Sequence, residues 1–305
     1  MHAMDLCHGD LTPSNMATRL ARPLDLLEAG DLNRMLGEPR TEDVEHLFVE
    51  TPSPAPRYLV DPIDLTLLPP DYLSTRICVL DFDHLYSCAS PPQRLSGIPP
   101  QFLAPETIFE LRYGPPADIW AFGCVLFRLR TSEDPFSTVE CPSDAVQEML
   151  GVLGELPVQW RTVRFDTATG HPIRGESDSG IEWHDFRDDG SGWMTLTPLE
   201  DMVDEILVPR TPESVETGLE KLALYLPRDV WLWGQENGEK DKFVAKHMRR
   251  IGKDDARLFS DLLRKIFDYD YQRRISARDI LKHEWLRWVD GAALSFPHNA
   301  ERSQS

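Results

Sequence analysis

The most regular hydrophobic pattern in the sequence lies between Ala117 and Leu129, where apolar residues cover most of the circumference of a helix. These residues are Ile119, Trp120, Phe122, Val125, Leu126, Phe127 and Leu129. A helix that is apolar on nearly every side has to be buried on nearly every side. The pattern therefore predicts a buried helix on which other elements of a globular core pack.

Two more helices are predicted near the C-terminus, and both are expected to pack on the buried helix. The first has apolar residues at helical spacing, and they are Leu258, Phe259, Leu262, Leu263, Ile266 and Phe267. Ser276 followed by Asp279 resembles the capping-box start of a second helix, through Leu286. Another helix is predicted over Asp144–Leu153, where Gly154 ends it.

The organisation predicts one domain over residues 1–290 that contains two irregular regions. A proline-rich, loop-rich insertion with one short helix covers about residues 20–72. It precedes a strand-like apolar run, Ile77–Leu80. An acidic loop region covers about residues 161–206, and residues 291–305 are expected to form a flexible tail.

Composition narrows the class of protein. The chain has 305 residues, of which 41% are hydrophobic, enough for a sizeable core. Its formal net charge of −19 argues against nucleic acid as a partner and is compatible with a basic one. The N-terminus becomes polar too early for a signal peptide. The apolar run Ile119–Leu129 is too short to span a bilayer, so we expect no membrane segment.

The cysteines are scattered along the chain, at Cys7, Cys78, Cys88, Cys124 and Cys141. Their number is odd and none lies in a CxxC spacing, so neither a disulfide framework nor a zinc site is indicated. This usage fits a reducing compartment. We therefore expect the protein in the cytoplasm, the nucleus or both.

The candidate chemistry lies in two short segments. His8–Asn15 reads HGDLTPSN, and Asp81-Phe82-Asp83 follows the strand-like run. Phosphoryl transfer requires a carboxylate that orients or accepts the proton of the attacking hydroxyl. It also requires oxygen ligands that hold magnesium on the nucleotide phosphates. Asp10, Asn15 and Asp81 offer these groups.

The order of the motifs resembles that of a eukaryotic protein kinase. After His8–Asn15 and Asp81–Asp83 come Ala104-Pro105-Glu106, Asp118 at the head of the buried helix, and Arg274 near the C-terminus. The resemblance implies the large lobe of a kinase. Such a lobe is mainly α (α+β overall), with short β-hairpins around the catalytic and metal loops. The small lobe of a kinase is expected to be absent from this sequence.

The resemblance also implies roles for the residues of the site. Asp10 would position the substrate hydroxyl, while Asn15 and Asp81 would bind magnesium and the phosphates of ATP. Four residues would support the site, namely His8, Glu106, Asp118 and Arg274. Among these, the glutamate and the arginine would form a buried ion pair, and the aspartate would bond the backbone of the catalytic loop.

Two segments, Gly97–Glu106 and Tyr113–Trp120, resemble the serine/arginine-rich-protein kinases more narrowly. Those enzymes transfer the γ-phosphoryl group of ATP to serines in Arg/Ser-rich segments. Together with the acidic charge of this chain, the resemblance implies a basic, Arg/Ser-rich protein substrate.

Several positions depart from the kinase pattern. Gly9 replaces an arginine that clamps a phosphorylated activation loop in many kinases, so control by such phosphorylation is not supported. Thr12 replaces the catalytic-loop lysine, and Asp83 replaces a glycine whose missing side chain permits unusual backbone angles. The sequence also contains no Gly-rich loop, strand lysine or partner glutamate. We therefore expect a fragment, or a chain that is inactive alone.

Two alternatives remain at this point. The departures suit a pseudokinase-like binding or scaffold module. HGDLxxxN followed by LDFD also resembles the aminoglycoside and choline phosphotransferases, small-molecule kinases that accept Gly9, Thr12 and Asp83. Against that second alternative stand Ala104-Pro105-Glu106, the helix of Asp118, and Arg274, which belong to the protein kinase pattern.

Overall fold

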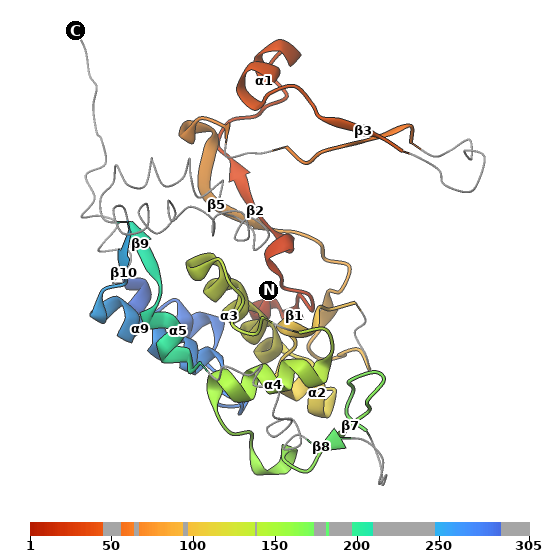
Figure 1. The fold of residues 1–305 in the computed structure, drawn as a ribbon, viewed down its shortest axis with the longest axis vertical. Coiled ribbons are helices and arrows are strands. Elements are labelled where there is room, and N and C mark those ends of the chain that lie inside the picture. Colours follow the sequence, from red (N-terminus) through yellow and green to blue (C-terminus); the bar gives the residue numbers. More distant parts are fainter. Residues whose placement is uncertain are drawn as a thin grey trace, which may run out of the picture. The chain divides into compact units, whose positions relative to one another are not determined.

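The computed structural model describes residues 1–44, 56–63, 67–93, 97–137, 139–173, 181–182, 197–209 and 248–287. The chain divides into two compact units (Figure 1). The larger unit combines Met1–Asn15 with Asp81–Ser305, and the smaller unit is Met16–Leu80. Asn15 and Asp81, the predicted magnesium ligands, are therefore the residues at which the chain leaves and re-enters the larger unit.

The core of the larger unit is built on helix α3, Pro115–Thr131. Proline suits its first turn because the N–H groups there have no partner within the helix. Trp120 is fully buried and Phe127 is 1% exposed. The predicted buried helix is confirmed except at its end, where Leu129 is 68% exposed.

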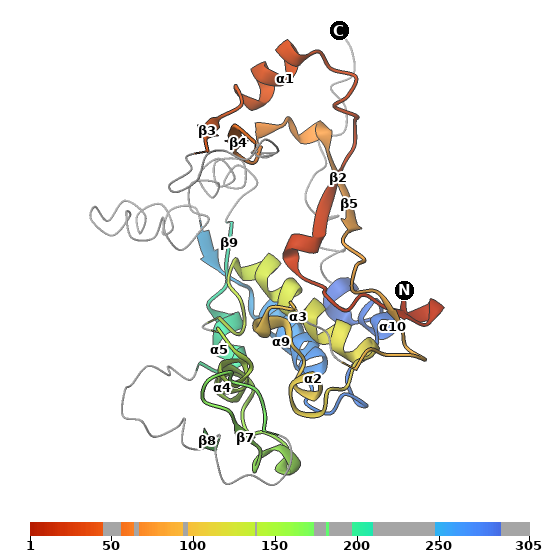
Figure 2. The ribbon, with the colours of Figure 1, turned by 90° about the vertical axis from the view of Figure 1, so that its right-hand side faces the viewer.

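The other helices described in the larger unit are α2 (Pro105–Glu110), α4 (Pro142–Leu153), α5 (Leu199–Asp204), α9 (Lys253–Ile266) and α10 (Ala277–Ile280). Helix α9 packs against both α3 and α5 (Figure 2). It buries Leu262, Leu263 and Ile266 completely, so the helix predicted from their spacing is confirmed. The predicted end of α4 at Gly154 is also found.

The helix predicted from Ser276 to Leu286 is interrupted. Ser276 caps α10 as expected, because its hydroxyl accepts the N–H of Asp279 at 3.2 Å, but the helix ends at Ile280. Residues 284–287 are helical again. The ring Nδ1 of His283 accepts the N–H of Trp285 at 3.2 Å. A side chain that satisfies a free N–H in this way starts a new helical turn.

Every described sheet is a pair of antiparallel strands. The pairs are β1 (Leu6–Cys7) with β6 (Tyr86–Ser87), β2 (Met16–Leu20) with β5 (Leu73–Val79), β3 (Thr41–Asp43) with β4 (Tyr58–Val60), β7 (Arg164–Phe165) with β8 (Ile181–Glu182), and β9 (Leu207–Pro209) with β10 (Met248–Arg250). The described fold is thus mixed α+β with several small sheets, less purely helical than expected. The predicted strand pairs around the catalytic and metal loops are β1–β6 and β2–β5.

The smaller unit contains β2–β5, β3–β4 and the helix α1, Ala29–Leu36. The insertion predicted over about residues 20–72 lies within this unit, and α1 is the short helix expected there. The pair β3–β4 was not predicted. Its apolar residues Tyr58, Leu59 and Val60 are all exposed, so the strand has no buried face and no alternating pattern that could reveal it.

Parts of two other predictions lie outside the described residues. They are residues 174–180 and 183–196 of the acidic loop region predicted at about 161–206, and the whole tail at 291–305. Where the acidic region is described, it includes β7 and α5. None of the helices in the described part of the chain has the length and apolar character that crossing a bilayer requires.

Gly123 sets the approach of α3 to α9. A Cβ atom at this position would lie 2.3 Å from Cγ2 of Ile266 and 2.8 Å from Cε1 of Phe267, far inside the usual carbon–carbon contact distance. We predict that Gly123→Ala lowers the free energy of unfolding by about 1–3 kcal/mol through overpacking. Urea denaturation followed by circular dichroism would measure the change.

The control for this prediction is Gly114→Ala at the start of the same helix. The nearest atom to an added Cβ there is Cδ of Pro116, at an ordinary 3.7 Å. We expect a change below about 1 kcal/mol, of the size seen at helix caps. Equal effects of the two substitutions would contradict the packing role of Gly123.

Candidate active site

Asp10 and Asn15 lie together in the loop that follows β1. The amide Nδ2 of Asn15 donates to Oδ2 of Asp10 at 3.0 Å and to the Asp10 carbonyl oxygen at 2.8 Å. The other carboxylate oxygen, Oδ1 of Asp10, is buried and has no hydrogen-bond partner among the described residues. One oxygen of the carboxylate is thus held in place, while the other is enclosed by protein and keeps an unused capacity to accept a hydrogen bond.

Asp118 fixes the backbone of this loop from the start of α3. Its Oδ2 accepts the N–H of His8 at 2.8 Å, and its Oδ1 accepts the N–H of Gly9 at 3.0 Å. The ring Nε2 of His2 lies 2.9 Å from the same Oδ2. Asp118 is 6% exposed. A carboxylate this deeply buried needs such partners to offset its lost hydration, so the contacts position the loop strongly.

Gly9 is required by the local geometry. Its φ is +83°, and a Cβ on it would lie only 2.6 Å from the carbonyl oxygen of His84. The missing side chain lets the segment after Asp81–Asp83 approach the loop. As a result, Nδ1 of His84 lies 3.9 Å from Oδ2 of Asp10. Sequence reasoning missed His84, and the signal that could have found it was the glycine itself, since a glycine often marks close backbone approach.

Asp81 has a left-handed backbone conformation, with φ at 59°. The unusual backbone angle was expected at Asp83, which replaces a glycine, but Asp83 is not among the residues with positive φ. Aspartate tolerates this conformation better than most residues. Asp81 is exposed, and in the described part of the chain it makes no hydrogen bond to Asp10 or Asn15. The ring of Phe82 packs on that of His8, with centroids 5.3 Å apart.

Glu106 and Arg274 form a buried, bidentate ion pair. Nη1 donates to Oε1 at 2.6 Å and Nη2 to Oε2 at 2.8 Å, and the side chains are 2% and 0% exposed. Arg274 also donates to the carbonyl oxygens of Pro116 and Asp268 and lies 5.0 Å from the ring centroid of Trp120. Every nitrogen of the guanidinium therefore has a partner, and the pair joins α2 to the start of α3.

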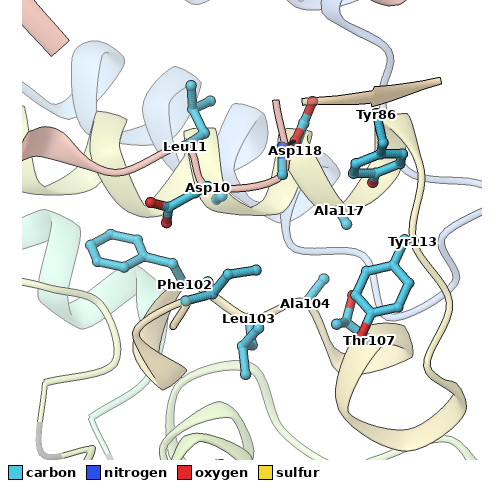
Figure 3. Close-up of a pocket in the computed structure, with 13 residues that line it drawn as sticks. Asp10, Leu11, Tyr86, Phe102, Leu103, Ala104, Thr107, Tyr113, Ala117 and Asp118 are labelled. Atoms are coloured by element: carbon cyan, nitrogen blue, oxygen red, sulfur yellow. Dashed lines mark hydrogen bonds between the residues drawn. The ribbon is translucent and has the colours of Figure 1, made fainter. Parts of the chain in front are cut away.

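A small pocket lies beside Asp10. Figure 3 shows Asp10 and Leu11 on one side of it and Phe102, Leu103 and Ala104 on the other. Tyr86 also lines the pocket, and burial raises the pKa of its hydroxyl well above the usual range. Tyr86 thus stays protonated.

Asn15 and Asp81 are the residues that could hold magnesium. Both bonds from the Asn15 side chain use the amide nitrogen, so the amide oxygen is the atom that could bind a cation. Asp81 is the first residue of the larger unit after the smaller one, and it is exposed. Oxygen atoms of this kind suit magnesium, which keeps several waters and takes few protein ligands.

The fold and these motifs define a protein kinase. The protein kinase domain family matches residues 74–286, more than two thirds of the chain. The chain therefore belongs to the protein kinase family. The loop His8–Asn15 precedes the matched residues, so its assignment rests on the geometry described above.

The curated proteins to which the chain is similar include protein kinases. The chain is 26% identical over 217 residues to the dual specificity tyrosine-phosphorylation-regulated kinase mbk-2 of Caenorhabditis elegans, covering 69% of this chain and 21% of that protein. It is 32% identical over 78 residues to the serine/threonine-protein kinase PLK4 of Drosophila grimshawi, covering 26% of this chain and 8% of that protein. The chain thus spans about a fifth or less of the curated relatives it matches.

We predict that Gly9→Ala destabilises the loop more than Gly97→Ala. Both glycines have almost the same positive φ, +83° and +84°, but an added Cβ at Gly97 meets nothing within 4 Å. The conformation alone should cost about 1–2 kcal/mol at each position, and the clash with His84 should add about 1–3 kcal/mol at Gly9. Chemical denaturation would measure both, and equal losses would refute the close approach of His84.

We predict that Arg274→Met lowers the free energy of unfolding by about 3–5 kcal/mol, because it leaves Glu106 buried without its partner. The control is Arg250→Met, which breaks the surface pair with Glu205, 65% and 69% exposed, and should cost about 0–1 kcal/mol. In the double variant Glu106→Leu, Arg274→Met the loss should be smaller than the sum of the single losses. Additive losses would contradict a coupled pair.

Proposed function

We propose that the chain carries the catalytic-loop region of a serine/threonine protein kinase. The observation that carries the proposal is the carboxylate of Asp10. One of its oxygens is held by Asn15, the other is buried without a hydrogen-bond partner among the described residues, and the residue itself lines the pocket. This arrangement suits a group that receives the proton of a substrate hydroxyl.

In the proposed reaction, the hydroxyl oxygen of a serine or threonine attacks the γ-phosphorus of ATP. The bond to the β-phosphate oxygen breaks, ADP leaves, and the hydroxyl proton passes to Asp10. Asn15 and Asp81 would hold magnesium, which neutralises phosphate charge when bound. Asp118 would keep Asp10 in position through the N–H groups of His8 and Gly9.

Thr12 weakens the expected catalysis. It is 6% exposed and stands where the family has a lysine that neutralises the transferred phosphate. Loss of one preorganised donor costs about 2.7–4 kcal/mol of transition-state stabilisation in other enzymes. Combined with the missing Gly-rich loop and strand lysine, this favours negligible turnover by the 305-residue chain alone. It also keeps a binding or scaffold role as the second candidate function.

The proposed substrate is a basic, Arg/Ser-rich protein of the cytoplasm or nucleus. The support is the resemblance of Gly97–Glu106 to the serine/arginine-rich-protein kinases, together with the net charge of −19. Ile98, Phe102 and Leu103 line the pocket, and among the described residues that line it the carboxylates are those of Asp10 and Asp118. Arginines of such a substrate would therefore bind acidic residues outside the pocket, where long-range charge attraction still acts.

Membership of the protein kinase family leaves the small-molecule phosphotransferase alternative without separate support. The ion pair of Glu106 and Arg274 is formed here, as the protein kinase pattern implies. We therefore expect neither choline nor kanamycin to accept phosphate.

The test compares the protein tagged at its own genomic locus with the recombinant 305-residue chain. We expect the native protein to phosphorylate an Arg/Ser peptide with ATP and magnesium, and Asp10→Asn to reduce the rate at least about 100-fold, the usual contribution of a positioned base. The matched peptide has alanine in place of arginine and should react poorly. The recombinant chain should bind ATP weakly and transfer negligible phosphate.

Three outcomes would decide against parts of this proposal. No transfer by the native protein would leave the binding module as the function. Transfer that survives Asp10→Asn would remove Asp10 from the reaction. Strong magnesium-dependent transfer by the recombinant chain, abolished by Asp10→Asn, would show that the chain alone suffices.

A further inference from the structure

Two cysteines far apart in the sequence lie together where β1 meets β6. The strands pair Cys7 with Tyr86, and the N–H of Cys88 donates to the carbonyl oxygen of Asp5 at 2.9 Å. Cys7 and Cys88 are therefore diagonal neighbours, and diagonal side chains on one face of a strand pair can touch. Their Sγ atoms are 3.3 Å apart.

The other cysteines have no such neighbour in the described part of the chain. Cys124 is buried and its thiol donates to the carbonyl oxygen of Gln101, whereas the Cys141 thiol contacts the hydroxyl of Ser143. All of the cysteines are free thiols in this structure. Among the cysteines described, Cys7 and Cys88 are thus the pair whose thiols are in contact.

The two thiols differ in access and reactivity. Cys7 is fully buried, whereas Cys88 is half-buried. Burial raises the pKa of the Cys7 thiol well above its usual range, so Cys7 is a poor nucleophile in the resting protein. An oxidant from solvent therefore meets Cys88 first, with Cys7 adjacent to complete the reaction.

We propose that Cys7 and Cys88 are a redox modification site, at which a peroxide converts the two thiols into a disulfide. The Cys88 thiolate attacks one peroxide oxygen, the O–O bond breaks, and a sulfenic acid and water result. Cys7 then attacks the sulfenic sulfur, the S–OH bond breaks, and a second water leaves. The two thiols give up two electrons and two protons, and the peroxide is reduced to two waters.

The geometry requires only a small rearrangement. A disulfide has an S–S distance of about 2.04 Å, so the sulfurs must approach by about 1.3 Å from their present 3.3 Å. The bond would join the residue directly before His8 to the segment directly after β6. It would thereby link the loop that carries Asp10 to the segment that carries His84. This modification does not depend on phosphoryl transfer, so it can be tested in a chain without activity.

The experiment exposes the reduced full chain to hydrogen peroxide and maps its disulfides by mass spectrometry without reduction. Trypsin leaves Cys78 and Cys88 in one fragment, residues 77–94. A second digestion on the N-terminal side of aspartate, at Asp81 and Asp83, separates them. We expect a linked pair of fragments that contain Cys7 and Cys88, lighter by two hydrogens and separated again by dithiothreitol.

Variants test the order of the two steps. In Cys7→Ala, the sulfenic acid on Cys88 has no partner, so dimedone should label Cys88. In Cys88→Ser, neither the disulfide nor a label on Cys7 should form. Cys78→Ser is the matched control and should leave the disulfide unchanged. Circular dichroism of each variant before oxidation establishes that it is folded.

The protein is treated with peroxide, quenched and then unfolded before alkylation. The proposal is overturned if both thiols can still be alkylated. It is also overturned if Cys88 pairs with Cys78, or if the disulfide joins two copies of the chain. Should Cys7→Ala fail to fold, Cys88→Ser alone decides, because loss of the linked fragments in this variant and their retention in Cys78→Ser identify the pair.

Discussion

The carboxylate of Asp118 is the interaction on which the candidate active site depends. It belongs to the first turn of α3, the helix on which the core of the larger unit is built, and it accepts the N–H groups of His8 and Gly9. Its loss would remove the acceptor of two backbone N–H groups at once. The position of Asp10 is therefore fixed relative to the core by hydrogen bonds rather than by packing of its own side chain.

The opposite wall of the pocket is tied to the same helix by a different interaction. Arg274 binds Glu106 in α2 and also the carbonyl oxygen of Pro116 in the first turn of α3. Residues Phe102–Ala104, which line the pocket, directly precede α2. Asp10 on one side and this apolar wall on the other thus take their positions from a single turn of helix. A change in that turn would move both sides of the pocket together.

The sequence was sufficient for the elements whose signals are local. The apolar circumference of α3 and the spacing in α9 predicted buried helices, and both are present. The interruption at His283 was missed although the bond that marks it is local, because histidine is not one of the residues that usually cap a helix. The contact of His84 with Asp10 was hidden for a different reason: it follows from the approach of two loops that lie far apart in the sequence.

The departures from the kinase pattern are linked by the same geometry. Gly9 stands where many kinases have an arginine. Because it has no Cβ atom, the carbonyl group of His84 can approach it closely. That approach brings Nδ1 of His84 to 3.9 Å from Oδ2 of Asp10. Thr12, in the same loop as Asp10, stands where the kinase pattern has a lysine. Cys7 lies on β1 and Cys88 directly after β6. A bond between them would therefore join the two segments whose close approach Gly9 permits.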